Sequence, residues 1–305
     1  MRKSILRLLF YGSLSLLLLS GCGGGGGGGS HVKVGDVFLP DFVKWSEVDK
    51  PGDTHMYGTS QTGSFTSTTS KIEGSPQLAN VTITYDKDGK IIKITLAKGG
   101  TDLSWDIAKG DEIDAEEEFI FVSNKEDTKN ALFSNPSDPN EQFYYQTYGV
   151  WMTEETSGSG KFGAISMGNR TRVDDLQKLT GKASFTGSST GIYINGSDQY
   201  LATSSVDVDV DFSKRELDFN TYDTSTRTLA NFETERPQNN SDLNMAGKLK
   251  YTTHNEFTGP VIANGGMTGS STGHFYGPNA EEVGGVFDLK GTGETYIGAY
   301  GGKRK

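Results

Sequence analysis

Two short strings in the chain match the Gly-x-Ser-x-Gly pattern that surrounds the nucleophile of many serine hydrolases. They are GSSTG at residues 187–191 and GSSTG again at residues 269–273. A hydrolase needs this serine on a sharp turn between a buried strand and a helix, followed along the chain by an acid and a histidine. Both strings instead have surroundings typical of β-turns, in which small residues lead into an aromatic-bearing strand. We therefore predict no catalytic residue and no enzyme activity.

Carboxylates occur in two patterns that could hold a cation. Asp207, Asp209 and Asp211 resemble part of a calcium loop, but the glycine that such a loop needs at its sixth position is missing. The valines between them favour a strand, on which the three carboxylates would share one solvated face. The run from 111 to 118 has six acids in eight residues, and it predicts a solvated loop or a docking surface for a basic partner. We predict no metal ligand in either pattern.

The four histidines are not spaced as metal ligands, so no metal site is predicted from them. Haem needs only one or two axial ligands, and His55 and His254 are candidates for that role. The alternative is that both are ordinary surface histidines, and His274 is expected to be structural. Tyr144 and Tyr148 share one face of an aromatic strand, where they either contact a ligand or pack one domain on another. No intrinsic cofactor is expected, and haem enters only as a candidate bound ligand.

The single cysteine, Cys22, has the surroundings of a lipid attachment site. Basic residues near the start precede an apolar run at 8–19, which has signal-peptide length and is too short to span a membrane. The run ends in the letters LSGC, which match the bacterial lipobox. We predict a lipoprotein signal peptide at 1–21, lipidation of Cys22, and a polyglycine tether at 22–30 that reaches roughly 15 Å. The alternative is a plain signal peptide with a chance cysteine.

Length and composition exclude several classes of protein. The chain has 305 residues, 41 glycines without a collagen period, and a formal net charge of −10. This acidity argues against a nucleic-acid partner, and one cysteine cannot form an intrachain disulfide. Residues 31–175 carry 14 Lys and Arg against 24 Asp and Glu, whereas residues 176–305 carry 12 against 15. Two domains with different surfaces are therefore expected at these ranges.

Alternation of apolar and polar residues dominates the chain after residue 31 and predicts strands throughout. From about residue 179, roughly eight strands separated by glycine-rich turns predict an antiparallel barrel or sandwich. The predicted fold class is all-β. The other elements that the pattern predicts are a hairpin at 81–85 and 91–96, strands at 143–152 and 161–167, and a short helix at 125–133.

The most informative motif lies in the second predicted domain. Residues 273–287 read GHFYGPNAEEVGGVF, which resembles the G-x-F-Y-G-P-x-A-x-E-x-G-G-x-F signature of the transferrin-binding protein B β-barrel family of surface lipoproteins. Relatives in that family include factor H-binding protein and hemophilin. Looser likenesses are found at residues 148–151, 181–187 and 301–304. The signature residues in this chain are Gly273, Phe275, Tyr276, Gly277, Pro278, Glu282, Gly284, Gly285 and Phe287.

The signature also has a direct physical interpretation. The Gly-Pro pair at 277–278 favours a turn, and residues 280–282 are expected to follow as one helical turn. The glycine pair at 284–285 leaves room where a strand bends at a barrel corner. Phe275 and Phe287 are expected to fill the barrel interior. The motif therefore specifies a fold rather than a catalytic site.

The resemblance implies a handle domain of strands followed by an eight-stranded antiparallel barrel. It also implies lipid anchoring to the bacterial outer membrane, surface exposure through a lipoprotein translocator, and capture of a host or environmental ligand. Iron or haem acquisition is favoured, and the alternatives are binding of a complement regulator for immune evasion or a structural or adhesive envelope role. Specificity is expected in variable loops at residues 195–204, 236–244 and 252–266.

Overall fold

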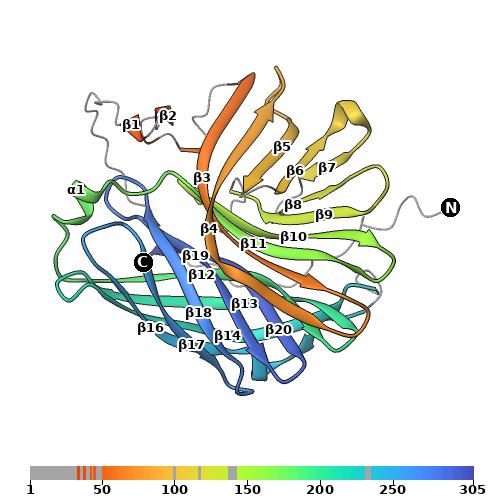
Figure 1. The fold of residues 1–305 in the computed structure, drawn as a ribbon. Coiled ribbons are helices and arrows are strands. Elements are labelled where there is room, and N and C mark those ends of the chain that lie inside the picture. Colours follow the sequence, from red (N-terminus) through yellow and green to blue (C-terminus); the bar gives the residue numbers. More distant parts are fainter. Residues whose placement is uncertain are drawn as a thin grey trace.

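The computed structural model describes residues 33–34, 37–38, 42, 44–45, 50–98, 101–115, 118–136, 143–230 and 235–305. Most of these residues lie in two large antiparallel sheets that are stacked on each other (Figure 1). The prediction of an all-β chain is confirmed. In this part of the chain, none of the helices has the length and apolar character needed to cross a membrane. A short pair, β1 (Lys33–Val34) and β2 (Val37–Phe38), precedes the two sheets.

The first sheet, called the handle sheet below, contains nine strands. They are β3 (Gly52–Phe65), β4 (Ser70–Tyr85), β5 (Ile91–Lys98), β6 (Thr101–Asp106), β7 (Glu112–Ala115), β8 (Phe119–Ser123), β9 (Lys129–Ser134), β10 (Gln146–Thr156) and β11 (Ser159–Gly168), with the 3-10 helix η2 (Ile107–Lys109) after β6. Their order is β6-β5-β4-β3-β11-β10-β9-β8-β7. The sheet curls so far that its two end strands come close together without becoming neighbours in this order of the described strands. It is therefore a nearly closed barrel.

The hairpin between β4 and β5 shows how the local sequence sets a turn of this sheet. The carboxylate of Asp86 accepts hydrogen bonds from the backbone N–H groups of Asp88 and Lys90, both at 2.9 Å. Gly89 has a φ of 78°, a left-handed conformation that glycine adopts without a steric cost. The hairpin predicted at 81–85 and 91–96 is confirmed.

The second sheet closes on itself. Its main strands are β12 (Lys182–Asn195), β13 (Asp198–Asp211), β14 (Glu216–Thr228), β16 (Met245–Tyr251), β17 (Phe257–Ala263), β18 (Thr268–Tyr276), β19 (Glu282–Gly291) and β20 (Glu294–Arg304). The short strand β15 (Gln238–Asn239) and the 3-10 helix η3 (Ser241–Leu243) lie between β14 and β16. Pairing of β13 with β14 joins the ends of the order β13-β12-β20-β19-β18-β17-β16-β14. The predicted eight-stranded antiparallel barrel is confirmed.

Side chains alternate between the barrel interior and the solvent. Val206, Val208 and Val210 are at most 2% exposed and belong to the interior cluster, whereas the aspartates between them lie on the outer face of β13. The prediction that the aspartates share one solvated face is therefore confirmed. Phe275 and Phe287 are both fully buried in the same cluster, as the signature predicts. Burial of apolar area of this kind is the main favourable term in folding.

The handle sheet packs its outer face on the barrel. Strands β3, β10 and β11 lie over β12, β19 and β20 (Figure 1). The helix α1 (Val173–Leu176) lies in the connection between the two sheets. The domain boundary predicted between residues 175 and 176 lies in this helix, and the division into domains stays a prediction. The apolar residues buried between the sheets are Phe65, Phe143, Tyr148, Val150, Phe162, Ala164, Ile192, Ile194, Leu201, Val286, Ile297 and Ala299.

The short helix predicted at 125–133 is wrong. The structure has a tight turn there, followed by strand β9. The side-chain oxygen of Asn124 accepts hydrogen bonds from the backbone N–H groups of Thr128 and Lys129, at 2.8 and 2.7 Å. Such a side-chain bond offers the backbone an alternative to helix. The next strand then pairs with both β8 and β10.

The turns predicted around the two GSSTG strings are wrong as well. Residues 187–191 lie inside β12 and residues 269–273 inside β18. Their small residues pair with other small residues on the adjacent strand, since Ser188 is opposite Gly301 on β20 and Gly273 is opposite Gly285 on β19. Small size serves close packing of strands here rather than chain reversal.

Several predicted loop boundaries also need correction. Residues 277–280 form a turn in which Ala280 has a positive φ of 54°, and β19 begins at Glu282, so no helical turn forms at 280–282. Strand β13 occupies most of the loop predicted at 195–204, and strand β17 lies inside the one predicted at 252–266. The acidic run at 111–118 contributes β7 at the edge of the handle sheet. In these segments strand pairing outweighs local polarity.

The contact between the sheets predicts the effect of adding one methyl group. In Gly284→Ala, the new Cβ would lie 2.0 Å from the side-chain oxygen of Gln146 and 3.0 Å from the hydroxyl of Ser166, both in the handle sheet. We expect a loss of about 1–3 kcal/mol in the free energy of unfolding, measured by urea denaturation. Gly302→Ala is the control, because the nearest atom to its new Cβ would be a valine methyl carbon at 3.2 Å, a much less severe contact. Equal stability of the two variants would contradict this account.

Candidate functional site

The junction between handle sheet and barrel is centred on a buried carboxylate of the signature. Glu282, at the start of β19, is 0% exposed. Its carboxylate accepts hydrogen bonds from the backbone N–H groups of Tyr144 and Tyr145, the second at 3.1 Å. The Gln146 side chain donates to the carbonyl of Val283 at 2.8 Å. Hydrogen bonds thus hold the residues that lead into β10 against the start of β19 in the barrel.

The environment of Glu282 alters its acidity. Burial raises its pKa from the ordinary value of 4.5 to about 7, although the two backbone N–H groups and nearby Lys303 favour the ionised form. The ammonium of Lys303 lies 4.1 Å from the centre of the Tyr144 ring, a cation–π distance. Glu282 is therefore a structural link whose charge changes near neutral pH.

A second polar cluster at the junction contains His274. Its ring is 3% exposed and lies 3.4 Å from the hydroxyl of Thr59 and 3.7 Å from the carboxylate of Glu256. The Arg170 guanidinium donates to Thr59 at 2.9 Å. Burial, with a further contribution from Arg170, lowers the His274 pKa well below its usual range, so the ring is neutral at pH 7. This histidine lies in the contact between the sheets, where a structural role is expected.

The residues predicted to bind a ligand lie in different surroundings. His55 is exposed on β3, with Nδ1 3.0 Å from the Thr82 hydroxyl, and His254 is exposed in the loop before β17. Tyr144 is partly buried at the junction. Tyr148 is 1% exposed, and its hydroxyl bonds to Ser188 of the barrel, so a ligand could reach it only if the sheets separated. Their roles as ligand-binding residues stay predictions.

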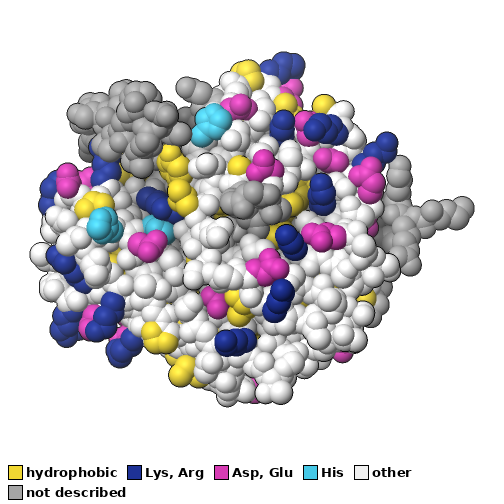
Figure 2. Space-filling model, viewed as in Figure 1, with side chains coloured by type: hydrophobic (Ala, Val, Ile, Leu, Met, Phe, Trp, Pro, Cys, Tyr) yellow, Lys and Arg dark blue, Asp and Glu magenta, His cyan; other side chains and the backbone are white. Residues whose placement is uncertain are grey.

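Two further predictions concern lipid and metal. The signal peptide, Cys22 and the tether at 22–30 lie outside the described residues. Among the residues that the structure describes, His, Cys, Asp and Glu side chains form no group of three or more that could hold a metal ion. On the face shown in Figure 2, Lys and Arg side chains are interspersed with Asp and Glu side chains, and they form no continuous basic area.

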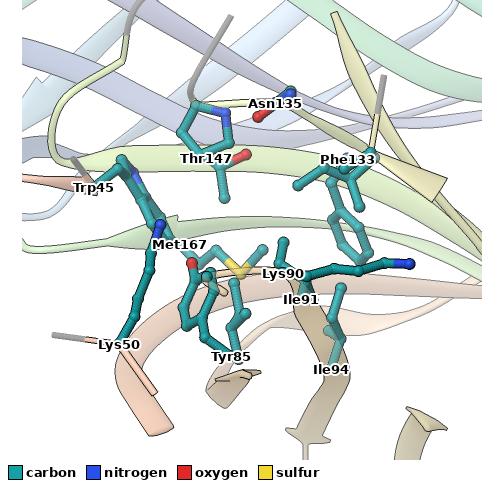
Figure 3. A pocket seen from close by; sticks show the side chains of 15 residues that line it. Trp45, Lys50, Tyr85, Lys90, Ile91, Ile94, Phe133, Asn135, Thr147 and Met167 are labelled. Atoms are coloured by element: carbon teal, nitrogen blue, oxygen red, sulfur yellow. The ribbon is translucent and has the colours of Figure 1, made fainter. Parts of the chain in front are cut away.

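The handle sheet holds a partly open cavity that sequence reasoning missed. The handle cavity, as it is called below, has a volume of about 200 Å³ and lies at the end of the sheet nearest the β4–β5 turn (Figure 3). Its lining comes from segments far apart in the chain, so no contiguous motif marks it. The only part of the lining that local sequence indicates is the turn of the predicted hairpin, which contains Lys90. The lining residues are Trp45, Lys50, Ile83, Tyr85, Gly89, Lys90, Ile91, Ile94, Ala115, Ile120, Phe133, Asn135, Pro136, Thr147 and Met167.

Comparison with known proteins gives one family. A family model described as the C-lobe and N-lobe beta barrels of Tf-binding protein B matches residues 145–304, more than half of the chain. No curated protein sequence matches the chain. The family model therefore covers the barrel together with β10 and β11 of the handle sheet.

Solved structures that resemble the chain are distant in sequence. A transferrin-binding protein B from Haemophilus parasuis Hp5 has 16% identity and a TM-score of 0.47, over 77% of this chain and 47% of that one. The haemoglobin receptor HpuA from Kingella denitrificans has 15% identity and a TM-score of 0.44, over 86% and 89%. The chain spans about half the length of the first of these structures.

The pKa of Glu282 predicts how its replacement changes stability with pH. A carboxyl whose pKa is raised on folding stabilises the folded state below its unfolded pKa, and that contribution is lost as pH rises through the folded value. A rise from 4.5 to about 7 corresponds to about 3 kcal/mol. The free energy of unfolding of the unaltered chain, relative to Glu282→Gln, should therefore be higher at pH 5 than at pH 8.

The measurement is urea denaturation of both chains at the two pH values. Glu155→Gln serves as the control, because Glu155 is an exposed carboxylate on β10 and its replacement removes the same charge away from the junction. A difference between the unaltered chain and Glu282→Gln that is the same at pH 5 and pH 8 would refute the assignment.

Proposed function

This chain belongs to the transferrin-binding protein B β-barrel family, and on that premise we propose that it is a surface lipoprotein of the bacterial outer membrane that binds a host protein carrying iron or haem. The family model names a binding protein, and the chain is accordingly a binding protein and not an enzyme. The match to residues 145–304 is the observation that carries the proposal.

The N-terminal sequence supports the anchoring part of the proposal. The lipobox ending at Cys22 would place lipid on the first residue of the mature chain, and the glycines that follow would hold the body roughly 15 Å from the bilayer. A flexible link of this kind lets a folded body turn toward a large partner. Surface exposure and export by a translocator are part of the same proposal.

The architecture supports binding of a macromolecule at the barrel rim. The long connection from β14 to β16, which contains residues 236–244, lies at the same end of the barrel as the β12–β13, β17–β18 and β19–β20 turns. Loops on a rigid scaffold can vary in sequence without disturbing the core. A closed barrel with a second sheet packed on its side is such a scaffold. Complement-regulator binding and an adhesive role without a ligand are the competing functions.

Affinity capture tests this function. Residues 31–305, which contain all the described strands, are immobilised and exposed to host plasma and to haemolysate, and retained proteins are identified by mass spectrometry. We expect an iron carrier or a haemoprotein. Retention of a complement regulator alone, or of nothing, would contradict the proposal.

A haem titration of the same body tests the predicted ligands. If haem itself is bound through His55 or His254, the Soret band should shift on binding, and alanine at the ligating position should abolish the shift. His31→Ala is the matched control and should leave the band unchanged. A Soret shift that survives both substitutions would exclude these histidines as ligands.

A further inference from the structure

We propose that the handle cavity binds a small amphiphilic anion, with an apolar body of about six to eight carbon atoms and one acidic head group. The inference rests on the cavity's volume, its apolar walls and two cationic side chains that line it (Figure 3). It does not depend on the function proposed above.

The walls of the cavity are core side chains. Ile83, Ile94, Phe133 and Met167 are each at most 3% exposed and belong to the hydrophobic cluster inside the handle sheet. Protein interiors are close-packed, and an apolar void of this size forfeits contacts that its lining would otherwise make. An engineered apolar cavity of about 150 Å³ stays dry and binds benzene. A volume of about 200 Å³ therefore suits a short alkyl chain or a small aromatic ring.

Two lysines bring positive charge to this apolar space. Lys50 precedes β3 and Lys90 ends the β4–β5 turn, and both line the cavity. In the described part of the chain, neither ammonium group lies within ion-pair distance of a carboxylate. Lys50 instead lies 5.0 Å from the centre of the Tyr85 ring. Both lysines are exposed, and an acidic group on a ligand would be the ion-pair partner that neither has among the described residues.

The acids nearest in sequence to Lys90 already have other partners. The carboxylate of Asp86 accepts from two backbone N–H groups of the turn, and that of Asp88 pairs with Lys87 at 2.8 Å. Asp86 attracts the ammonium of Lys90 at longer range, since Lys90 contributes to the lowered pKa of Asp86, but the two do not form an ion pair.

The side chain of Lys50 passes close to a glycine of the β4–β5 turn. A Cβ on Gly89 would lie 2.8 Å from the Cδ atom of Lys50, so the absence of a side chain at residue 89 makes room for the lysine stem. Tyr85 adds a polar atom to the wall, and burial raises its pKa to about 12, so its hydroxyl remains protonated and can donate to an anion. The hairpin thus supplies Lys90 and Tyr85 and contacts the stem of Lys50.

The geometry also selects against other ligands. An uncharged apolar molecule would gain no attraction from the two ammonium groups. A haem macrocycle is far larger than benzene and does not fit a volume of about 200 Å³. A carboxylate with a short apolar tail satisfies both the volume and the charge.

Calorimetric titration with sodium octanoate tests the proposal on residues 31–305. We expect saturable binding, and at least tenfold weaker binding of 1-octanol, which has the same tail without the charge. The double variant Lys50→Gln/Lys90→Gln should weaken octanoate binding at least tenfold. Lys87→Gln is the matched control, because it removes a lysine of the same turn that does not line the cavity.

A second variant tests the apolar part separately. Ile91→Phe places a larger side chain on a partly buried wall position and should abolish octanoate binding, with folding checked by circular dichroism. Absence of saturable octanoate binding to the unaltered body would overturn the proposal. Binding unchanged by the double lysine variant or by Ile91→Phe would overturn it as well, because octanoate would then bind elsewhere.

Discussion

The structure depends on close contact between two curved sheets, one of which is a closed barrel. Two sheets can pack this way only where small residues let their surfaces approach. Gly301 of β20 and Gly284 of β19 provide such places: a Cβ on the first would lie 2.8 Å from the ring of Tyr148, and one on the second 2.0 Å from the side chain of Gln146. The buried carboxylate of Glu282 then ties the start of β10 to the same barrel edge. Apolar packing and a few satisfied polar groups together hold the sheets in one arrangement.

This constraint explains which parts of the fold could be predicted from the sequence. Strict alternation, as at Val206 to Asp211, and the signature around Phe275 indicated the barrel because each depends on one strand and its neighbours. The GSSTG strings were misinterpreted because small residues mark turns and close strand contacts alike. The helix expected at 125–133 failed because Asn124 stabilises a turn and two neighbouring strands pair with the segment that follows.

The candidate sites differ in how visible they are in sequence. A contiguous motif such as the lipobox can be recognised without a structure. The handle cavity cannot, because Lys50, Ile94 and Met167 converge only when the handle sheet curls. Exposed His55 and His254 remain candidate ligand-binding residues. Tyr148 is packed between the sheets, so an aromatic residue on the predicted strand face can stabilise the fold rather than contact a ligand. A rigid scaffold with loops at the barrel rim and a separate cavity in the handle sheet leaves room for two kinds of ligand.

Growth of the source bacterium on a host iron protein tests the central claim most directly. A deletion strain is supplied with iron only as transferrin or as haemoglobin, and it is complemented with the unaltered gene or with Cys22→Ser, which removes the predicted lipid attachment. The account predicts that the deletion strain fails to grow on at least one of these sources, that the unaltered gene restores growth, that Cys22→Ser does not, and that all strains grow equally on a ferrous salt. Equal growth of the deletion and parent strains on both host proteins would contradict it.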